Sequence, residues 1–142
     1  MEQFDLFLAE NENVISVSQS KNYNALVFAY VGDSVFSLFV RNFFATKSTS
    51  KAGVLNAQTN KVVRASAQSK ILDGLMHLLT EEELAIVRSA RNIKTNNVAK
   101  NSNLEDYKKA TSFEAVIGYL YMTNQVPRLK ELLKKSLEIE LN

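Results

Sequence analysis

The sequence predicts an all-α protein, and three features support this prediction. Glycine and proline are scarce, with 4 and 1 residues in a chain of 142. Apolar residues recur at spacings of three and four, and no segment sustains the alternation of apolar and polar residues that is typical of a strand. With 46% hydrophobic residues, the chain can bury one substantial core. We therefore expect a single domain over residues 1–142, without internal repeats or linkers.

About seven helices are expected, in the order 3–9, 23–44, 54–64, 66–78, 81–92, 106–123 and 127–138. The first four and the sixth rest on apolar spacing. The fifth has a clear start, because Thr80 followed by Glu83 forms a capping box. Before the sixth, the asparagine-rich, basic segment 92–103 is expected to be a loop. The last helix begins with Pro127 at its first position, where the missing N–H costs nothing.

The composition excludes several kinds of chemistry. The chain has no cysteine, which excludes disulfides and thiolate metal sites, and its one histidine, His77, argues against a histidine-based zinc site or a Ser-His-Asp triad. Asp33 and Arg41 interrupt the longest apolar run before it reaches the roughly 18 to 20 residues of a membrane span. No basic region precedes an apolar stretch at the N-terminus. We expect a cytoplasmic protein, without membrane attachment, whose chemistry uses carboxylates, hydroxyls, amides and amines.

Basic residues are concentrated in two segments, 41–70 and 84–104, which contain no acidic residue although the net charge is only +2. The acidic residues collect in 81–83 and in the two terminal segments. If the basic segments lie together in the fold, they form a cationic surface that would bind a polyanion such as nucleic acid. The alternative, that they are ordinary solvated helix faces, remains open at this point.

Three carboxylates lie in apolar helical surroundings: Asp33, Asp73 and Glu114. On a helix, the neighbours of Asp33 and Glu114 at three and four residues are mostly apolar, so both faces are expected to look inward. An ionised carboxylate there needs a cation, hydrogen-bond donors or a metal ion. Asp73 precedes a glycine near a predicted helix end, which is ordinary turn chemistry.

Glycines accompany two of these carboxylates. Gly32 precedes Asp33, and Gly118 follows Glu114 by one turn, each inside a predicted helix where glycine costs about 1 kcal/mol relative to alanine. Such glycines allow two helices to approach closely, which would bring the two carboxylates to a common metal ion. From the residues alone, an alternative stays open: the carboxylates make polar contacts inside a helix pair, and the glycines serve only packing.

A resemblance to a known family rests on FAYVGDSVFSLFVR (28–41) and ATSFEAVIGYLYMT (110–123). Three segments between them agree in order and spacing: VRASAQSKIL (63–72), LTEEELAIVRSARNIKT (79–95) and VAKNSNLEDYKKAT (98–111). From residue 23 to the C-terminus, the chain resembles the catalytic domain of the ribonuclease III superfamily. It is most similar to the Mini-III ribonucleases, which consist of that domain alone.

This resemblance implies an all-helical ribonuclease III-type endonuclease that forms a homodimer. It further implies magnesium-dependent hydrolysis of double-stranded RNA, with the precursor of large-subunit ribosomal RNA as the substrate and with an activated water in place of a nucleophilic side chain. By position, Asp33 and Glu114 match the catalytic carboxylates, both as Mg²⁺ ligands. The alternative is a non-catalytic relative that binds double-stranded RNA.

Two positions depart from the larger members of the superfamily. These have a glutamate where this chain has Ala29 and an aspartate where it has Thr111. Mini-III ribonucleases tend to share both replacements, so the narrower resemblance is strengthened. With two carboxylates per site, one Mg²⁺ that keeps several waters is expected rather than two ions. Thr111 would orient one of those waters, or else its hydroxyl bonds to its own helix backbone; both alternatives remain open.

Substrate binding is expected to use the catalytic domain itself, since no double-stranded RNA-binding domain follows it in this sequence. The candidate RNA-binding residues are Lys47, Lys51, Lys61, Arg64, Arg88, Arg91, Lys94 and Lys100. Gln68, in the segment ASAQSK, resembles a family position. A place near the site stays open as an alternative, but we expect an exposed helical glutamine.

Dimerisation has a separate argument in segment 26–44, which is apolar nearly all round and must be covered on every side. One small domain offers too little cover. The alternative is the central core helix of a monomer.

Overall fold

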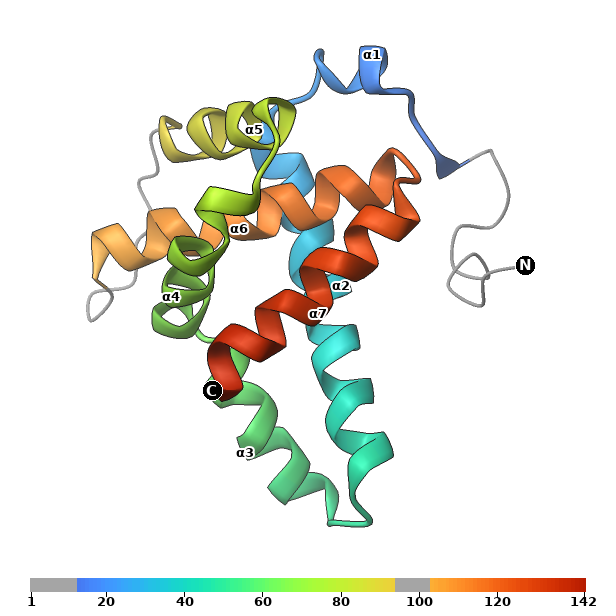
Figure 1. Ribbon diagram of the computed structural model, residues 1–142, viewed down its shortest axis with the longest axis vertical. Helices are drawn as coiled ribbons and strands as arrows, with labels where there is room; N and C mark the ends of the chain where they lie inside the picture. The colour runs from blue at the N-terminus through green and yellow to red at the C-terminus, as the bar shows by residue number, and fades with distance from the viewer. Residues whose placement is uncertain (1–12, 94–102) are drawn as a thin grey trace.

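The helices expected within residues 13–93 and 103–142 are present in the structure, a computed structural model that describes these residues (Figure 1). Within these residues the chain forms seven α-helices, one short 3₁₀ helix and no strand. Their bounds are α1 Val17–Ser20, α2 Ala25–Lys47, α3 Ala52–Val63, α4 Ala65–Leu75, the 3₁₀ helix Met76–Leu78, α5 Glu81–Arg91, α6 Leu104–Met122 and α7 Val126–Leu141. The predicted all-α class is thus confirmed. The expected helix 3–9 lies outside the described residues, and so do residues 94–102 of the expected loop.

The differences from the predicted elements are local. Helix α1 was not expected, because its single turn is too short to show apolar periodicity. It is held by a capping box, in which the Gln19 N–H donates to Ser16 Oγ at 2.9 Å and the Ser16 N–H donates to Gln19 Oε1 at 2.8 Å. The helix expected over 66–78 is α4, which ends at Leu75 and continues as the 3₁₀ turn.

Helix α6 runs through the middle of the molecule, with α2, α4, α5 and α7 packed against it (Figure 1). It crosses α2 where two glycines meet. A Cβ atom on Gly32 would lie 1.8 Å from the Glu114 carbonyl oxygen, and one on Gly118 would lie 1.8 Å from the Phe28 carbonyl oxygen. Only glycine fits either position, because backbone atoms fill the space of the missing side chain. The interpretation of these glycines as a close helix approach is therefore confirmed.

Aromatic pairs fill the core on both sides of this crossing. Phe36 of α2 meets Phe113 of α6 edge to face, with ring centroids 4.9 Å apart. Phe28 and Tyr119 form a second such pair at 5.7 Å. Edge-to-face contacts of this kind add about 0.5–1.5 kcal/mol to the burial of the rings, so they fix how α2 and α6 are oriented against each other.

The predicted capping box at the start of α5 is present and extends into an ion pair. The Glu83 N–H donates to Thr80 Oγ1 at 3.2 Å, and the Thr80 N–H donates to Glu83 Oε1 at 2.9 Å. Arg128 of α7 donates to both oxygens of the same carboxylate, at 2.8 and 2.9 Å. Burial acts to raise the pKa of Glu83, but the hydrogen bonds and charge of Arg128 outweigh it and lower the pKa. This contact ties α7 to the start of α5.

Helix α2 has several large apolar side chains on its outer side. Val27, Tyr30 and Leu38 are 40%, 80% and 46% exposed. By length and composition alone α2 could cross a membrane, which differs from the sequence expectation. Its phenylalanines, valines and leucines outweigh Asp33 and Arg41 in mean hydropathy. The second half of α2 and α3 lie side by side and extend away from the other helices (Figure 1).

Candidate active site

The two predicted catalytic carboxylates meet at the crossing of α2 and α6. Asp33 directly follows Gly32 on α2, and Glu114 lies one turn before Gly118 on α6. The Glu114 backbone rests against Gly32. The two side chains are close enough for Asp33 to act on Glu114 both through a hydrogen bond and through its charge. The fold thus brings together two residues separated by 81 positions, as the glycines and acids indicated.

The electrostatics of this pair are unfavourable without a cation. Burial raises the pKa of Glu114, and the hydrogen bond and charge of Asp33 raise it further, to about 8. The amide of Gln68 acts in the opposite direction. Two partly buried carboxylates repel each other when both are ionised, so a proton or a metal cation between them stabilises the pair.

Asp33 is more exposed than predicted. The expectation that both carboxylates face inward is wrong for Asp33, whose residue is exposed, whereas Glu114 is partly buried. The reason is the helix turn of about 100° per residue. Gly32 faces α6 directly, so Asp33, the next residue, lies at the rim of the contact. The pair therefore lies at the edge of the helix crossing, where Asp33 is accessible to solvent.

Gln68 was predicted to be exposed, and this was wrong. Its exposed fraction is 1%. Its Nε2 atom donates to the Val63 carbonyl oxygen at 2.9 Å and to Glu114 Oε2 at 3.4 Å. The sequence held a signal for this burial, because Ile71 and Leu75 lie on the same helical face at three and seven residues and are also buried.

The residues at this site fit a hard divalent cation. Among residues 13–93 and 103–142, no three His, Cys, Asp or Glu side chains are grouped so that they could hold a metal ion. Two carboxylates leave most of an octahedral shell to water and substrate, which suits Mg²⁺ and does not suit a structural zinc site. The Oε1 atom of Gln68 is buried without a hydrogen-bond partner in the described part of the chain. It is an additional acceptor next to the carboxylate pair.

The two positions that depart from the larger enzymes also lie at this crossing. Ala29 is buried, at 7% exposure, and provides an apolar wall one turn before Asp33. Thr111, one turn before Glu114, donates its hydroxyl hydrogen to the Tyr107 carbonyl oxygen at 2.9 Å. A hydrogen bond from Thr111 to its own helix backbone was one of the two alternatives expected from the sequence, the other being the orientation of a water. In this geometry Thr111 Oγ1 can only accept a hydrogen bond from a water.

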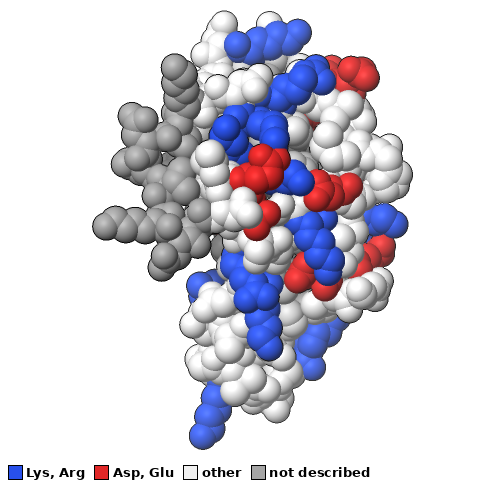
Figure 2. Space-filling view, turned by 90° about the vertical axis from the view of Figure 1, so that its left-hand side faces the viewer, with Lys and Arg blue, Asp and Glu red and all other residues white. Residues whose placement is uncertain are grey.

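The predicted RNA-binding residues occupy three places. Lys47 and Lys51 flank the turn between α2 and α3, whereas Lys61 and Arg64 lie at the other end of α3, roughly 18 Å away for a helix of 12 residues. Lys47 lies over the Phe43 ring, 5.4 Å from its centroid. Figure 2 shows that the end formed by α3 and the second half of α2 bears basic side chains without acidic ones.

The third place is the end of α5. Arg88 is exposed there, and Arg91 pairs with Glu105 at the start of α6. In this region basic and acidic side chains alternate on the surface (Figure 2). Lys94 and Lys100 lie outside the described residues.

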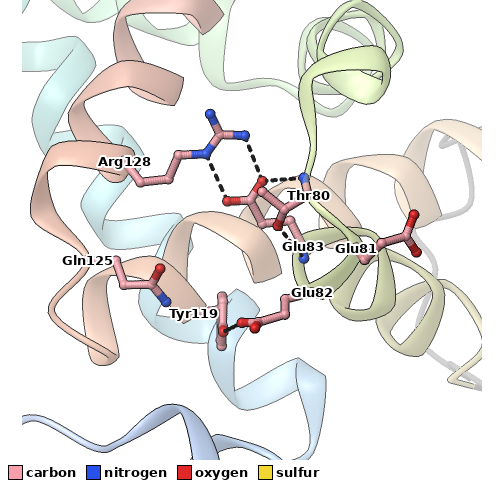
Figure 3. A pocket seen from close by; sticks show the side chains of 7 residues that line it. All are labelled: Thr80, Glu81, Glu82, Glu83, Tyr119, Gln125 and Arg128. Atoms are coloured by element: carbon pink, nitrogen blue, oxygen red, sulfur yellow. Dashed lines mark hydrogen bonds and ion pairs between the residues drawn. The ribbon is translucent and has the colours of Figure 1, made fainter.

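A hollow at the start of α5 is separate from the carboxylate pair (Figure 3). It is lined by Thr80, Glu81, Glu82, Glu83, Tyr119, Gln125 and Arg128. Most of its polar groups already have partners, because the Tyr119 hydroxyl donates to Glu82 at 3.0 Å and Arg128 pairs with Glu83 in the lining and with Glu131 next to it. We assign it a structural role.

Comparison with known proteins places this arrangement in a family. Residues 26–125 match the ribonuclease III domain. The chain is 41% identical to Mini-ribonuclease 3 of Clostridium tetani over 115 residues, which is 80% of this chain and 76% of that relative. It is 34% identical to Mini-ribonuclease 3 of a Thermoanaerobacter species over 139 residues, 98% of both chains. A crystal structure of a Fusobacterium nucleatum protein covers 83% of this chain and 94% of its own, with a TM-score of 0.75 and 28% identity.

The matched segment contains both carboxylates and both glycines of the crossing. The domain acts on RNA, and nucleases of this type generally depend on a metal ion. The chain therefore belongs to the ribonuclease III domain family, as a relative of Mini-ribonuclease 3, and is an endoribonuclease.

Proposed function

We propose that this endoribonuclease hydrolyses double-stranded RNA with Mg²⁺ held by Asp33 and Glu114, and that it matures the precursor of large-subunit ribosomal RNA. The observation that carries the proposal is the carboxylate pair at the rim of the glycine crossing. When bound, the cation lowers the pKa of a water and offsets charge on the phosphoryl oxygens.

The chain's own residues supply binding and orientation. Glu114 loses its proton to hold the cation together with Asp33, and the exposed position of Asp33 lets a phosphate approach from solvent. Thr111 Oγ1 accepts a hydrogen bond from a water and so orients it. The basic end formed by α3 and the second half of α2 contacts phosphates of the duplex, which suits RNA recognised through its backbone and shape.

We also propose a cytoplasmic homodimer. The apolar outer stripe of α2 needs cover, and a second copy related by a two-fold axis would bring the same stripe against it. Membrane insertion is disfavoured because Asp33 lies mid-helix, where an ionisable residue costs several kcal/mol in a bilayer. Such a dimer would present two carboxylate pairs to the two strands of one duplex.

The nuclease proposal is tested with purified protein, a duplex RNA and Mg²⁺. Asp33→Asn and Glu114→Gln should each reduce cleavage about 100-fold or more, since loss of a ligand exceeds the 10–100-fold cost of losing a supporting residue. Asp73→Asn is the matched control. Asp73 is an exposed carboxylate that pairs with Lys109 at 3.0 Å, away from the crossing, so cleavage should continue unchanged.

If the unaltered protein binds duplex RNA, but neither it nor any of the three variants cleaves that RNA, the chain is a non-catalytic RNA-binding relative.

The proposal that the substrate is the ribosomal RNA precursor is tested separately, with a transcript that contains the paired ends of the large-subunit precursor. Discrete cleavage within that stem is expected, and an unrelated duplex of equal length should be cut more slowly. Equal rates on both would contradict the ribosomal assignment.

A further inference from the structure

Gln68 is a buried polar residue between three helices. It lies on the first turn of α4, its amide bonds to the last residue of α3, and the same amide reaches Glu114 on α6. A buried amide is costly unless it is hydrogen-bonded, so this side chain requires a reason beyond packing.

The orientation of the amide is determined by its surroundings. Nε2 faces two acceptors, the Val63 carbonyl oxygen and Glu114 Oε2. Rotating the amide by 180° would place Oε1 against both oxygens and leave no donor for either. Val63 ends α3, so its carbonyl has no partner further along that helix, and the Gln68 amide supplies one. The donor is therefore fixed toward Glu114.

The two hydrogen bonds differ in length in an informative way. The 2.9 Å bond to Val63 fixes the amide to the backbone, whereas the 3.4 Å bond to Glu114 is long. Hydrogen bonds in catalytic sites without substrate are often long and tighten only in the complex with substrate. Gln68 is the group that lowers the pKa of Glu114, whereas Asp33 raises it. Without the Gln68 amide, the Glu114 carboxylate would face the like charge of Asp33 with no donor to offset it.

We propose that Gln68 is a positioning residue, which holds the Glu114 carboxylate in the orientation that receives the cation by anchoring it to the end of α3. The inference rests on the proposed function, in which Glu114 is a metal ligand. The unpartnered Oε1 atom lies on the same amide, so it is also close to the carboxylate pair and can accept a hydrogen bond from a water there.

The test measures cation binding directly, without RNA, using Mn²⁺ as the probe and electron paramagnetic resonance to quantify the free ion. Gln68→Met removes the amide at nearly constant volume and should raise the Mn²⁺ dissociation constant about tenfold, within the range for supporting residues of metal ligands. Gln58→Met is the matched control. Gln58 of α3 also has a buried, unpartnered Oε1, so the same change there should leave the constant within about twofold of the unaltered protein.

A second readout separates positioning from general destabilisation. Cleavage by Gln68→Met should recover as the Mg²⁺ concentration rises, because only cation affinity is impaired. If Gln68→Met does not fold, Gln68→Asn replaces it; its amide is one methylene shorter, cannot reach both acceptors, and should show the same loss.

The outcomes are distinguishable. Unchanged Mn²⁺ affinity of the Gln68 variant, while Asp33→Asn abolishes binding, would overturn the positioning role and leave the proposed function standing. Absence of Mn²⁺ binding and of cleavage in the unaltered protein would overturn both.

Discussion

Glu114 is a half-buried carboxyl group beside a second carboxylate, and this placement links folding to pH. Its pKa, raised to about 8 by burial and by Asp33, lies above the ordinary value of 4.5. Between these values the folded state holds a proton that the unfolded chain releases. The free energy of unfolding therefore gains a contribution that is fully present below about pH 4.5 and is lost as pH rises toward 8.

This linkage can be measured by urea unfolding in EDTA at pH 5, 6, 7 and 8. The unaltered protein should lose stability over this range relative to Glu114→Gln, whose side chain does not titrate. The difference between the two curves should shrink in Mg²⁺, because the cation takes the place of the proton. Asp73→Asn should keep the slope of the unaltered protein. Parallel curves for the unaltered protein and Glu114→Gln would contradict the assignment.

Candidate site residues could be predicted from the sequence where a charged side chain lay among apolar neighbours. Asp33 and Glu114 stood out because carboxylates are expensive on apolar helix faces, and the structure places them together. Exposure was harder to predict. Asp33 lies at the rim because Gly32, one residue earlier, takes the contact, and Gln68 is buried because α3 and α6 cover its face of α4. Both depend on where other helices lie, which the spacing within one helix does not determine.

At the scale of helices, the crossing of α2 and α6 depends on two missing side chains. A methyl group at Gly32 or Gly118 would overlap a backbone oxygen at 1.8 Å, so the helices must separate to accept it. The separation would move Asp33 away from Glu114. Packing and site geometry are therefore coupled at this crossing.

Gly32→Ala and Gly118→Ala should each destabilise the fold by about 3 kcal/mol or more, since overpacking against rigid backbone cannot be relieved by rotamer changes. Gly53→Ala is the matched control. A Cβ at Gly53 of α3 meets nothing within 4 Å, so alanine there should stabilise by up to about 1 kcal/mol through helix propensity. Urea unfolding measures all three, and losses below 1 kcal/mol at Gly32 would contradict the close approach.

Helix positions followed from the sequence because each has its own local signal. The capping box at Thr80 marked the start of α5, and Pro127 marked the start of α7, where it is the second residue rather than the first. Which helices would touch was indicated only by the glycines. The burial of Glu83 with Arg128 gave no such signal, because their contact joins positions far apart in the chain.

At the scale of the whole molecule, the candidate basic contacts and the exposed apolar side chains lie in different places. Lys51, Lys61 and Arg64 lie along α3 and Lys47 ends α2 beside it, whereas Val27, Tyr30 and Leu38 form a stripe along α2. Asp33 lies on the same helix as this stripe, and an ionisable residue makes insertion into a bilayer costly. Contact with another protein surface of matching shape would cover the stripe without that cost. A second copy of the chain offers that match without any further component.

The proposed dimer predicts a specific response to a charge on this stripe. Light scattering after size exclusion should give the unaltered protein twice the 16.0 kDa mass of one chain at micromolar concentration. Leu38→Lys should shift it to the monomer, because a buried ammonium on each side of a two-fold contact has no counter-charge. Val54→Lys is the matched control, since Val54 on α3 is 51% exposed but lies off the stripe.

The same variants decide what covers α2. If a bilayer covered the stripe, the unaltered protein would float with lipid vesicles, and Leu38→Lys would abolish flotation without changing the mass in solution. If two copies cover it, no flotation is expected, and Leu38→Lys should lower cleavage of long duplexes by separating the paired sites while each carboxylate pair still binds Mn²⁺. A folded monomer for the unaltered protein would contradict the dimer. Retained cation binding in that monomer would show that the carboxylate pair at the glycine crossing is complete within one chain.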